Sequence, residues 1–320
     1  MAGVKVRMKI VMINDCAFVG ETLLKYMSPE MEKQHIKRNR GAWSKTFGIA
    51  YKILKTKADL YHAHYLLQDC YIATRSGKKP LVGHAHGSDL RRSLKHFLWG
   101  RVVRHNLKKC NRILVSTPDV LNIAREFRND AEYLPNPVDT ELFYPGPTAQ
   151  PAEKKKVLIA SDCNWVVKGT DIAVRALSRI KEEVNVSIIG YGLDFHKTLA
   201  LASSLSLPLN VLPIIPHEKI AQYYWNADLV IDRFTLGSLG MVSLEAITCG
   251  RPVLAYVSSE YPENEHFPLK DLREEEDIAE TISSMSTKLW EDEYSFLKEH
   301  HNTEAIESRL MSIYSELLRD

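Results

Sequence analysis

The sequence of 320 residues contains no apolar run close to the ~18 residues that a membrane-spanning helix requires. Cysteine is scarce: the five residues are odd in number and form no CxxC pair, which excludes a disulfide framework and gives no zinc-site spacing. The stretch MKIVMIN is too short for a signal-peptide core. We therefore expect a cytoplasmic protein with reduced thiols, which could still lie peripherally on the cytoplasmic face of a membrane.

Apolar residues make up 45% of the chain and charged residues 26%, which is ordinary for a soluble globular protein and excludes disordered, collagen-like and coiled-coil classes. Because a domain takes roughly 100–200 residues, the length predicts two domains. Of the 42 basic and 40 acidic residues, 25 and 13 lie at or before Pro145, which leaves 17 and 27 after it. The basic first part favours phosphates, nucleic acid or an anionic membrane as partners, unless the imbalance is only that of a solvated surface.

Short runs with strand-like composition alternate with helix-period segments in both halves of the chain. Such alternation predicts parallel sheets that helices cover on both faces. Two such series predict an α/β chain with two Rossmann-like domains that face each other across a cleft. The runs are Lys9–Ile13, Leu60–His64, Leu81–His86, Arg112–Ser116 and Ala131–Leu134, then Val157–Ser161, Val184–Gly190, Leu209–Pro213, Leu229–Asp232 and Val253–Val257.

Two predicted helices have recognisable apolar faces. The first face consists of Trp43, Phe47, Ala50, Tyr51 and Leu54. The second belongs to the last element of the chain and consists of Ile306, Leu310, Ile313, Tyr314 and Leu317.

A cluster of prolines between Pro135 and Pro151 marks the domain boundary, because proline stops both helices and central strands. We place the linker near Asp139–Glu153. The predicted domains are residues 1–142 and 143–300, and because ligands of open parallel sheets bind beyond the carboxyl ends of the strands, one domain could hold a nucleotide and the other an acceptor. A terminal helix at 301–320 could pack back on the first domain.

The segment NADLVIDRFTLGSLGMVSLEAITCGRPVLAYV predicts a strand, a glycine-containing loop, a helix from about Met241, a turn and another strand. The first N–H groups of a helix are unpaired and carry partial positive charge, and glycine lets a phosphate approach the backbone closely. Glu245 lies further along this helix, where its carboxylate could accept hydrogen bonds from a ribose diol. The alternative is an ordinary turn and helical glutamate. The loop consists of Gly237, Ser238, Leu239 and Gly240.

This segment resembles the signature of the family-four retaining glycosyltransferases, the glycosyl transferases group 1, which have the GT-B fold. In that family two Glu residues flank seven others. The second Glu matches Glu245 and implies binding of the ribose of a nucleotide-sugar, and the family glycine matches Gly240. The first Glu, which contacts the donor sugar in the family, falls at Gly237 in this sequence.

Other segments match the family in the same order, so the resemblance covers most of the chain. In ASDCNWVVKGTDIAVRAL, Lys168 matches a lysine that binds the donor diphosphate, whereas the family arginine falls at Cys163. Taken alone, Lys168 could equally be a solvated surface lysine. The segment IIGYGLD resembles a glycine turn near the nucleotide and includes Gly190, and the resemblance places backbone groups around Ile214 against the base.

In the first domain, PLVGHAHGSDL places His86 at the end of a strand. The resemblance implies that His86 hydrogen-bonds the donor sugar, although a structural histidine is the alternative. Gly20 matches one glycine of the loop that follows the first strand. The predicted catalytic residues are thus His86 and Lys168, and the predicted donor-binding residues are Gly20, Gly190, Ile214, Gly237, Ser238, Leu239, Gly240 and Glu245.

Strand periodicity puts His84 and His86 on one face, and His62 and His64 likewise. A four-histidine metal cluster is conceivable, but the sequence does not show the surrounding hydrogen bonds that such a site needs, and the family requires no metal. We therefore predict no metal and no cofactor other than the substrate, a UDP- or GDP-sugar.

Two basic stretches belong to the first domain: KRNR at Lys37–Arg40, and RRSLKHFLWGRVVRHNLKK. In the second, apolar residues including Phe97 and Trp99 interleave with arginines and lysines, as in segments that lie on an anionic bilayer. A plain surface helix with one buried face is the other interpretation. Nucleic acid is not expected, because no recognisable nucleic-acid motif is present.

The sequence thus predicts a two-domain GT-B hexosyltransferase. The resemblance implies transfer with retention from a nucleotide-sugar to a glycan or lipid-linked acceptor. Two alternatives remain open, a non-catalytic GT-B scaffold or binding subunit and a nucleotide-sugar epimerase, since function is decided by the site and not by the fold.

Overall fold

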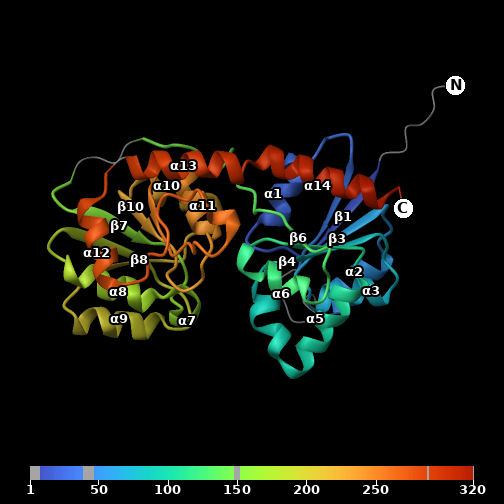
Figure 1. Cartoon of the computed structure of the whole chain (residues 1–320), viewed down its shortest axis with the longest axis horizontal. Coiled ribbons are helices and arrows are strands. Elements are labelled where there is room, and N and C mark those ends of the chain that lie inside the picture. Colours follow the sequence, from blue (N-terminus) through green and yellow to red (C-terminus); the bar gives the residue numbers. More distant parts are fainter. Residues whose placement is uncertain (1–7, 39–46, 148–151, 287, 320) are drawn as a thin grey trace. The chain divides into compact units, whose positions relative to one another are not determined.

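The computed structural model describes residues 8–38, 47–147, 152–286 and 288–319. The chain divides into two compact units, the first made of Met1–Pro137 and His301–Asp320 and the second of Val138–His300. Each unit contains one parallel sheet with helices on both faces (Figure 1). The predicted α/β architecture with two Rossmann-like sheets is confirmed.

The sheet of the first unit has the order β2-β1-β3-β4-β5-β6, and every pair is parallel. Its central strands are buried on both sides, which explains the apolar runs of β1 and β5, whereas β3 and β4 carry the buried His62, His64 and His84. Helices α2, α3, α5 and α6 contribute to the core on one face, whereas α1 and α14 lie together on the other. The strands are β1 Lys9–Ile13, β2 Glu32–Ile36, β3 Leu60–His64, β4 Leu81–Ala85, β5 Arg112–Val115 and β6 Glu132–Tyr133. The helices are α1 Val19–Tyr26, α2 Ile49–Lys55, α3 Gln68–Arg75, α4 Ser88–Arg91, α5 Phe97–Lys109, α6 Leu121–Arg125 and α14 Thr303–Leu317.

The sheet of the second unit has the order β11-β10-β7-β8-β9 and is also parallel. This order reverses next to β7, and ligands of open α/β sheets bind at such a reversal, beyond the carboxyl ends of the strands. The strands are β7 Lys155–Ile159, β8 Val184–Ile189, β9 Leu209–Leu212, β10 Leu229–Ile231 and β11 Val253–Leu254. The helices are α7 Trp165–Lys168, α8 Thr170–Arg179, α9 Phe195–Ser204, α10 Ile220–Trp225, α11 Met241–Thr248, α12 Glu275–Ser284 and α13 Lys288–His300.

The ten predicted strands are present; Lys9–Ile13 and Leu60–His64 have the predicted bounds, and the ends of the others differ by at most three residues. The prediction missed β2, whose sequence EKQHI is polar because this strand lies at the sheet edge and is only partly buried. The apolar face predicted for α14 is correct, since all five of its residues are buried.

The face predicted for the helix around α2 is wrong. Phe47, Tyr51 and Leu54 are 64%, 63% and 55% exposed, and the helix buries Ile49 and Ile53 instead. These two residues are four positions apart and pack into the core of the unit. Trp43, the first residue of the predicted face, lies outside the described residues.

The segment predicted as a linker packs, up to Pro147, into the second unit. Phe143 is buried in a core cluster of that unit. Gly146 lies so close to Trp225 that a β-carbon there would collide with the indole. Arg251 further fixes this segment by donating a hydrogen bond to the carbonyl of Pro147 at 2.5 Å.

Candidate functional site

A buried carboxylate, Asp232, organises the end of β10. Lys168 Nζ, from the end of α7, donates to Asp232 Oδ1 at 3.2 Å. Arg233 Nε lies 3.3 Å from Oδ2 of the same carboxylate. Ser243 Oγ and the amide of Gly240 donate to Oδ2 at 2.9 and 3.1 Å. The carboxylate therefore holds two cations beside the first turn of α11.

The charges in this cluster stabilise one another. Burial disfavours the ionised carboxylate, but the positive charges of Arg233 and Lys168 outweigh that effect and hold the pKa of Asp232 well below its ordinary value. Burial, and then repulsion from Arg233, lower the pKa of Lys168. Two cations share Asp232, and the carboxylate of Asp162 also acts on Lys168. An anionic ligand beside Lys168 and Arg233 would interact favourably with both cations.

The start of α11 offers hydrogen-bond donors, but fewer than the sequence suggested. The amide of Gly240 is occupied by Asp232, and that of Ser238 donates to the carbonyl of Leu236 at 2.8 Å. The amides of Met241 and Val242 lie in the first turn of α11. Because no helical residue precedes them by four positions, their N–H groups have no carbonyl acceptor within the helix. Because a β-carbon at Gly240 would collide with Arg233, the glycine is what lets the guanidinium lie over this helix start.

Glu245 is buried one turn further along α11. Its Oε1 hydrogen-bonds His217 Nε2 at 2.8 Å, and Tyr224 Oη donates to Oε2 at 3.0 Å. Burial and the neighbouring carboxylate raise the pKa of Tyr224 well above its ordinary value, so its hydroxyl keeps the proton that it donates. A carboxylate has about four lone-pair positions, so this fixed group can still accept hydrogen bonds from a diol.

The loops after β7 and β8 are tightly joined. Cys163 is buried, and its backbone bonds with Tyr191 and Asp194 at 2.9 Å each. Burial raises the pKa of the Cys163 thiol to about 11. Gly192 has φ +115°, and a β-carbon there would collide with the backbone of Cys163. This contact fixes the glycine turn that Gly190 begins.

Among the predicted nucleotide contacts, Ile214 is 70% exposed in the segment after β9 and is accessible to a ligand. Gly190 donates its amide to the carbonyl of Leu212 at 2.8 Å, and a β-carbon on it would lie 3.1 Å from Val211. The lack of a side chain at Gly190 therefore lets the turn after β8 pack closely against the end of β9.

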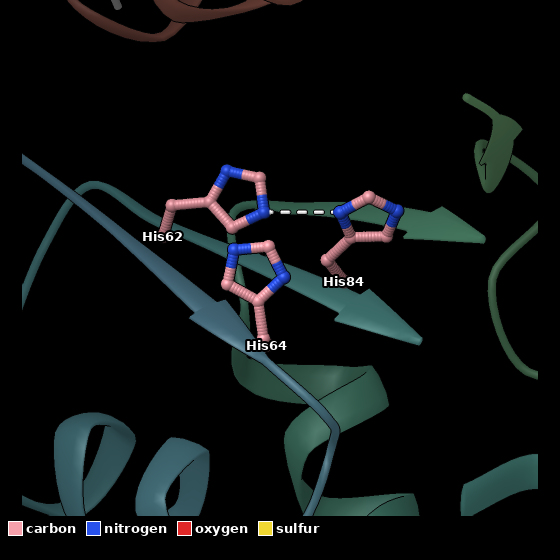
Figure 2. Close-up of side chains that lie close together, drawn as sticks. All are labelled: His62, His64 and His84. Carbon is pink, nitrogen blue, oxygen red and sulfur yellow. Dashed lines mark hydrogen bonds between the residues drawn. The ribbon is translucent and has the colours of Figure 1, made fainter. Parts of the chain in front are cut away.

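In the first unit, four imidazoles lie against one another beside Tyr314 of α14 and form an imidazole stack. They belong to His62 and His64 of β3, to His84 of β4, and to His86, which directly follows β4. His64 Nδ1 and His86 Nε2 share a hydrogen bond of 2.9 Å. Figure 2 shows His62 pointing to His84, with 3.2 Å between Nε2 and Nδ1. His62 Nδ1 in turn lies 2.6 Å from Tyr314 Oη. The predicted sugar-binding residue His86 is thus one member of an imidazole stack.

The rings are neutral. Burial and the neighbouring imidazoles lower the pKa of His62, His84 and His86 well below the ordinary 6.5, and burial lowers that of His64 to about 4. Each neutral ring has one donor and one acceptor nitrogen. Among the described residues, His86 Nδ1 is buried and has no hydrogen-bond partner.

Nitrogens of His62, His64 and His84 lie within 4.8 Å of one another, close enough for small side-chain movements to let all three coordinate a metal ion (Figure 2). A metal-bound imidazole, however, normally donates its other N–H to an acceptor. His62 has such a partner in Tyr314 and His64 has one in His86, whereas His84 Nδ1 contacts only the ring of His62. The rings form hydrogen-bonded pairs, and the two nitrogens without a partner among the described residues, His64 Nε2 and His84 Nε2, are those that a metal ion could bind.

Gly20 lies in the first turn of α1 and contacts the imidazole stack. A β-carbon at Gly20 would lie 2.7 Å from His64 Nε2. The Gly20 amide donates to Asp15 Oδ1 at 2.8 Å, and the same oxygen accepts from the amide of Cys16 at 2.7 Å. The start of α1 is therefore capped by a carboxylate of the chain itself.

Both units of the chain match known protein-family models. Residues 143–267 match the family model "Glycosyl transferases group 1", and residues 30–142 match "Glycosyltransferase Family 4". The chain belongs to the family 4 glycosyltransferases. The predicted family is confirmed, and with it the predicted activity class, sugar transfer from a nucleotide-sugar donor.

Named relatives of this family 4 glycosyltransferase are distant. It is 23% identical to the N-acetyl-alpha-D-glucosaminyl L-malate synthase of Bacillus anthracis, over 82% of this chain and 76% of that one. It is 28% identical to a GDP-mannose-dependent alpha-(1-6)-phosphatidylinositol monomannoside mannosyltransferase of Mycolicibacterium smegmatis, over 60% of this chain and 56% of that enzyme.

Solved structures have the same fold. The sucrose-phosphate synthase of Thermosynechococcus elongatus matches with a TM-score of 0.77 at 17% identity, over 98% of this chain and 100% of that one. HepE of Anabaena, solved with UDP and glucose, matches with a TM-score of 0.77 at 16% identity, over 97% and 100%. The GT-B fold class predicted from the resemblance is confirmed.

The structure explains both departures of this glycosyltransferase from the family pattern. At Gly237, where the pattern has Glu, a β-carbon would lie 2.6 Å from that of Ser258, and Asn264 donates to the Gly237 carbonyl at 2.9 Å. The loop is thus packed where a carboxylate would project. At the family arginine position, Cys163 is fully buried in the core of the unit.

Sequence reasoning missed Arg233, Asp232 and the two partners of Glu245. Arg233 lies two residues after the end of β10, in the stretch that carries the family motif, but no role was predicted for it from the sequence. The only available signal was its position beside Asp232, immediately after a buried strand in an α/β fold. No helix of the described chain is long and apolar enough to cross a membrane.

Proposed function

We propose that this family 4 glycosyltransferase binds the diphosphate of a UDP- or GDP-sugar at the start of α11, between Lys168 and Arg233. The single observation that carries the proposal is the sharing of Asp232 by these two cations, at 3.2 and 3.3 Å, beside the first turn of a helix. Arg233 would supply the second positive charge that the family pattern places at the position of Cys163.

In this proposal Glu245 accepts hydrogen bonds from the ribose, held in place by His217 and Tyr224, while Ile214 lies near the base. His86 hydrogen-bonds the donor sugar. Gly237, Ser238, Leu239 and Gly240 shape the loop, Gly190 shapes the neighbouring turn, and Gly20 makes room for His64.

The proposed reaction transfers a hexose with retention to a hydroxyl of a glycan or lipid-linked acceptor. The bond between the anomeric carbon and the diphosphate oxygen breaks, and the acceptor oxygen forms its bond on the same face. Negative charge that develops on the leaving diphosphate is stabilised by Lys168, Arg233 and the helix amides, usually the largest catalytic contribution. No metal or other cofactor takes part.

A direct test incubates the purified protein with UDP- and GDP-sugars, with and without glycan and lipid acceptors. We expect release of one nucleoside diphosphate, and we expect this release to depend on the acceptor. In Lys168→Gln the kcat should fall at least tenfold, because the variant lacks the ammonium group that stabilises the leaving diphosphate. Sugar-nucleotide conversion without acceptor would favour an epimerase. Binding without any turnover would favour a scaffold, and either result would contradict the proposal.

A further inference from the structure

The beginning of α5 exposes three consecutive apolar side chains. Phe97, Leu98 and Trp99 are 72%, 62% and 40% exposed, while the helix buries Gly100, Val103, Asn106 and Leu107 against the unit. Runs of three exposed apolar residues destabilise a protein in water unless they have a function. The exposed run therefore points to an environment that is not water.

The same segment is strongly basic. No Asp or Glu occurs between Leu90 and Pro118. Its exposed cations make no ion pair with a described residue, unlike Arg91 and Arg112, which pair with Asp119 and Glu132. The exposed cations are Arg92, Lys95, Arg101, Arg104, Lys108 and Lys109.

Helical geometry places the cations in one stripe that begins at Phe97, while Leu98 and Trp99 complete the exposed apolar first turn of α5. Phe97, Arg101, Arg104 and Lys108 follow at spacings of four, three and four residues, so they form one stripe along α5. Arg101 lies over the ring of Phe97, 4.1 Å from its centroid. An apolar tip that continues into a basic stripe is the pattern of helices that lie in the interface of an anionic bilayer.

We propose that the α5 face, defined as Phe97, Leu98, Trp99, Arg101, Arg104 and Lys108, binds the protein to an anionic phospholipid bilayer. The three apolar side chains enter the headgroup region, and the cations contact lipid phosphates. Charge complementarity selects this partner, because the stretch between Leu90 and Pro118 has no acidic residue and the residues at or before Pro145 include 25 basic and 13 acidic ones. Leu98 favours lipid over nucleic acid, because an aliphatic side chain is no stacking partner for a base.

The test is co-sedimentation of the full chain with vesicles. We expect binding to vesicles of equal parts phosphatidylglycerol and phosphatidylcholine, weak binding to phosphatidylcholine alone, and release at high salt. The variant Phe97→Ser/Leu98→Ser/Trp99→Ser should bind at least tenfold more weakly. Arg101→Gln/Arg104→Gln/Lys108→Gln should lose about fivefold per charge, roughly a hundredfold in total.

Leu318→Ser is the matched control. Leu318 is 40% exposed, as Trp99 is, but it ends α14, on the side of the unit away from α5 (Figure 1). Thermal unfolding should change little in the glutamine variant and in Leu318→Ser, and the serine variant, which also loses the covered part of Trp99, should still unfold cooperatively. Wild-type binding that ignores lipid charge, an unaffected serine variant, an equal loss in Leu318→Ser, or preferential binding to RNA would each overturn the proposal. Vesicle binding requires no sugar donor, so failure here would leave the proposed function intact.

Discussion

Gly20 and His64 are in contact in a way that a single methyl group would disturb. We predict that Gly20→Ala destabilises the protein by about 1–3 kcal/mol, because the new β-carbon would lie 2.7 Å from His64 Nε2. Urea unfolding of Gly20→Ala, His64→Ala and the double variant measures this coupling. The double variant should recover part of the loss, whereas simple additivity of the two effects would contradict the contact.

The imidazole stack should make stability depend on pH. The pKa values of its four histidines are lowered in the folded protein, so below pH 6.5 the unfolded chain binds protons that the folded chain does not. Stability is therefore lost as the pH falls from 6.5 toward 5, with each ring contributing up to about 1.4 kcal/mol per pH unit.

Denaturant unfolding at several pH values between 5 and 7 measures this slope. His84→Leu should reduce it, whatever its effect on stability at pH 7. The control is His266→Leu, at an exposed imidazole, which should leave the slope unchanged. Equal slopes in wild type and His84→Leu would show that His84 is not held neutral by its surroundings.

At the scale of elements, α14 comes from the far end of the sequence and completes the first unit. Its residues Leu310 and Tyr314 are fully buried, and the Tyr314 hydroxyl lies 2.6 Å from His62 Nδ1. Helix α14 therefore contributes both apolar packing and the hydrogen bond between the Tyr314 hydroxyl and Nδ1 of His62.

Tyr314→Phe removes that hydrogen bond and keeps the packing. We expect a loss of about 1–3 kcal/mol in the free energy of unfolding, because a buried nitrogen of His62 loses its partner. Tyr51→Phe, on the exposed face of α2, is the control and should change stability by less than about 0.5 kcal/mol. Equal effects of the two substitutions would mean that the bond has no net value.

Elements buried on both faces were the predictable ones. The strand β1 is buried from Ile10 to Ile13 and appears as the apolar run IVMI in the sequence, whereas the polar edge strand β2 gives no such signal. The face of α2 was mistaken because apolar periodicity shows that a helix has an apolar side, but not that this side is covered. Ile49 and Ile53 are buried, and Phe47 and Tyr51 are not.

At the scale of the whole chain, the family motifs predicted Lys168, Glu245 and the start of α11. They could not predict how these residues are held. Lys168, Asp232 and Gly240 are far apart in the sequence and meet only because parallel strands end at one edge of a sheet. The role proposed for Arg233 is equally a property of the fold, since its guanidinium reaches the helix start only where Gly240 leaves room.

The central claim, that Lys168 and Arg233 bind the donor diphosphate, concerns a phosphate group. Calorimetric titration of the full chain with UDP and UMP, or with GDP and GMP, is carried out for wild type and for Arg233→Gln. Comparing the two ligands of a pair gives the contribution of the second phosphate to the binding free energy. We predict that the variant binds the diphosphate about ten- to a hundredfold more weakly, as expected for a lost charge-assisted hydrogen bond, and the monophosphate almost unchanged. Equal losses for both ligands, or no loss for either, would contradict the account.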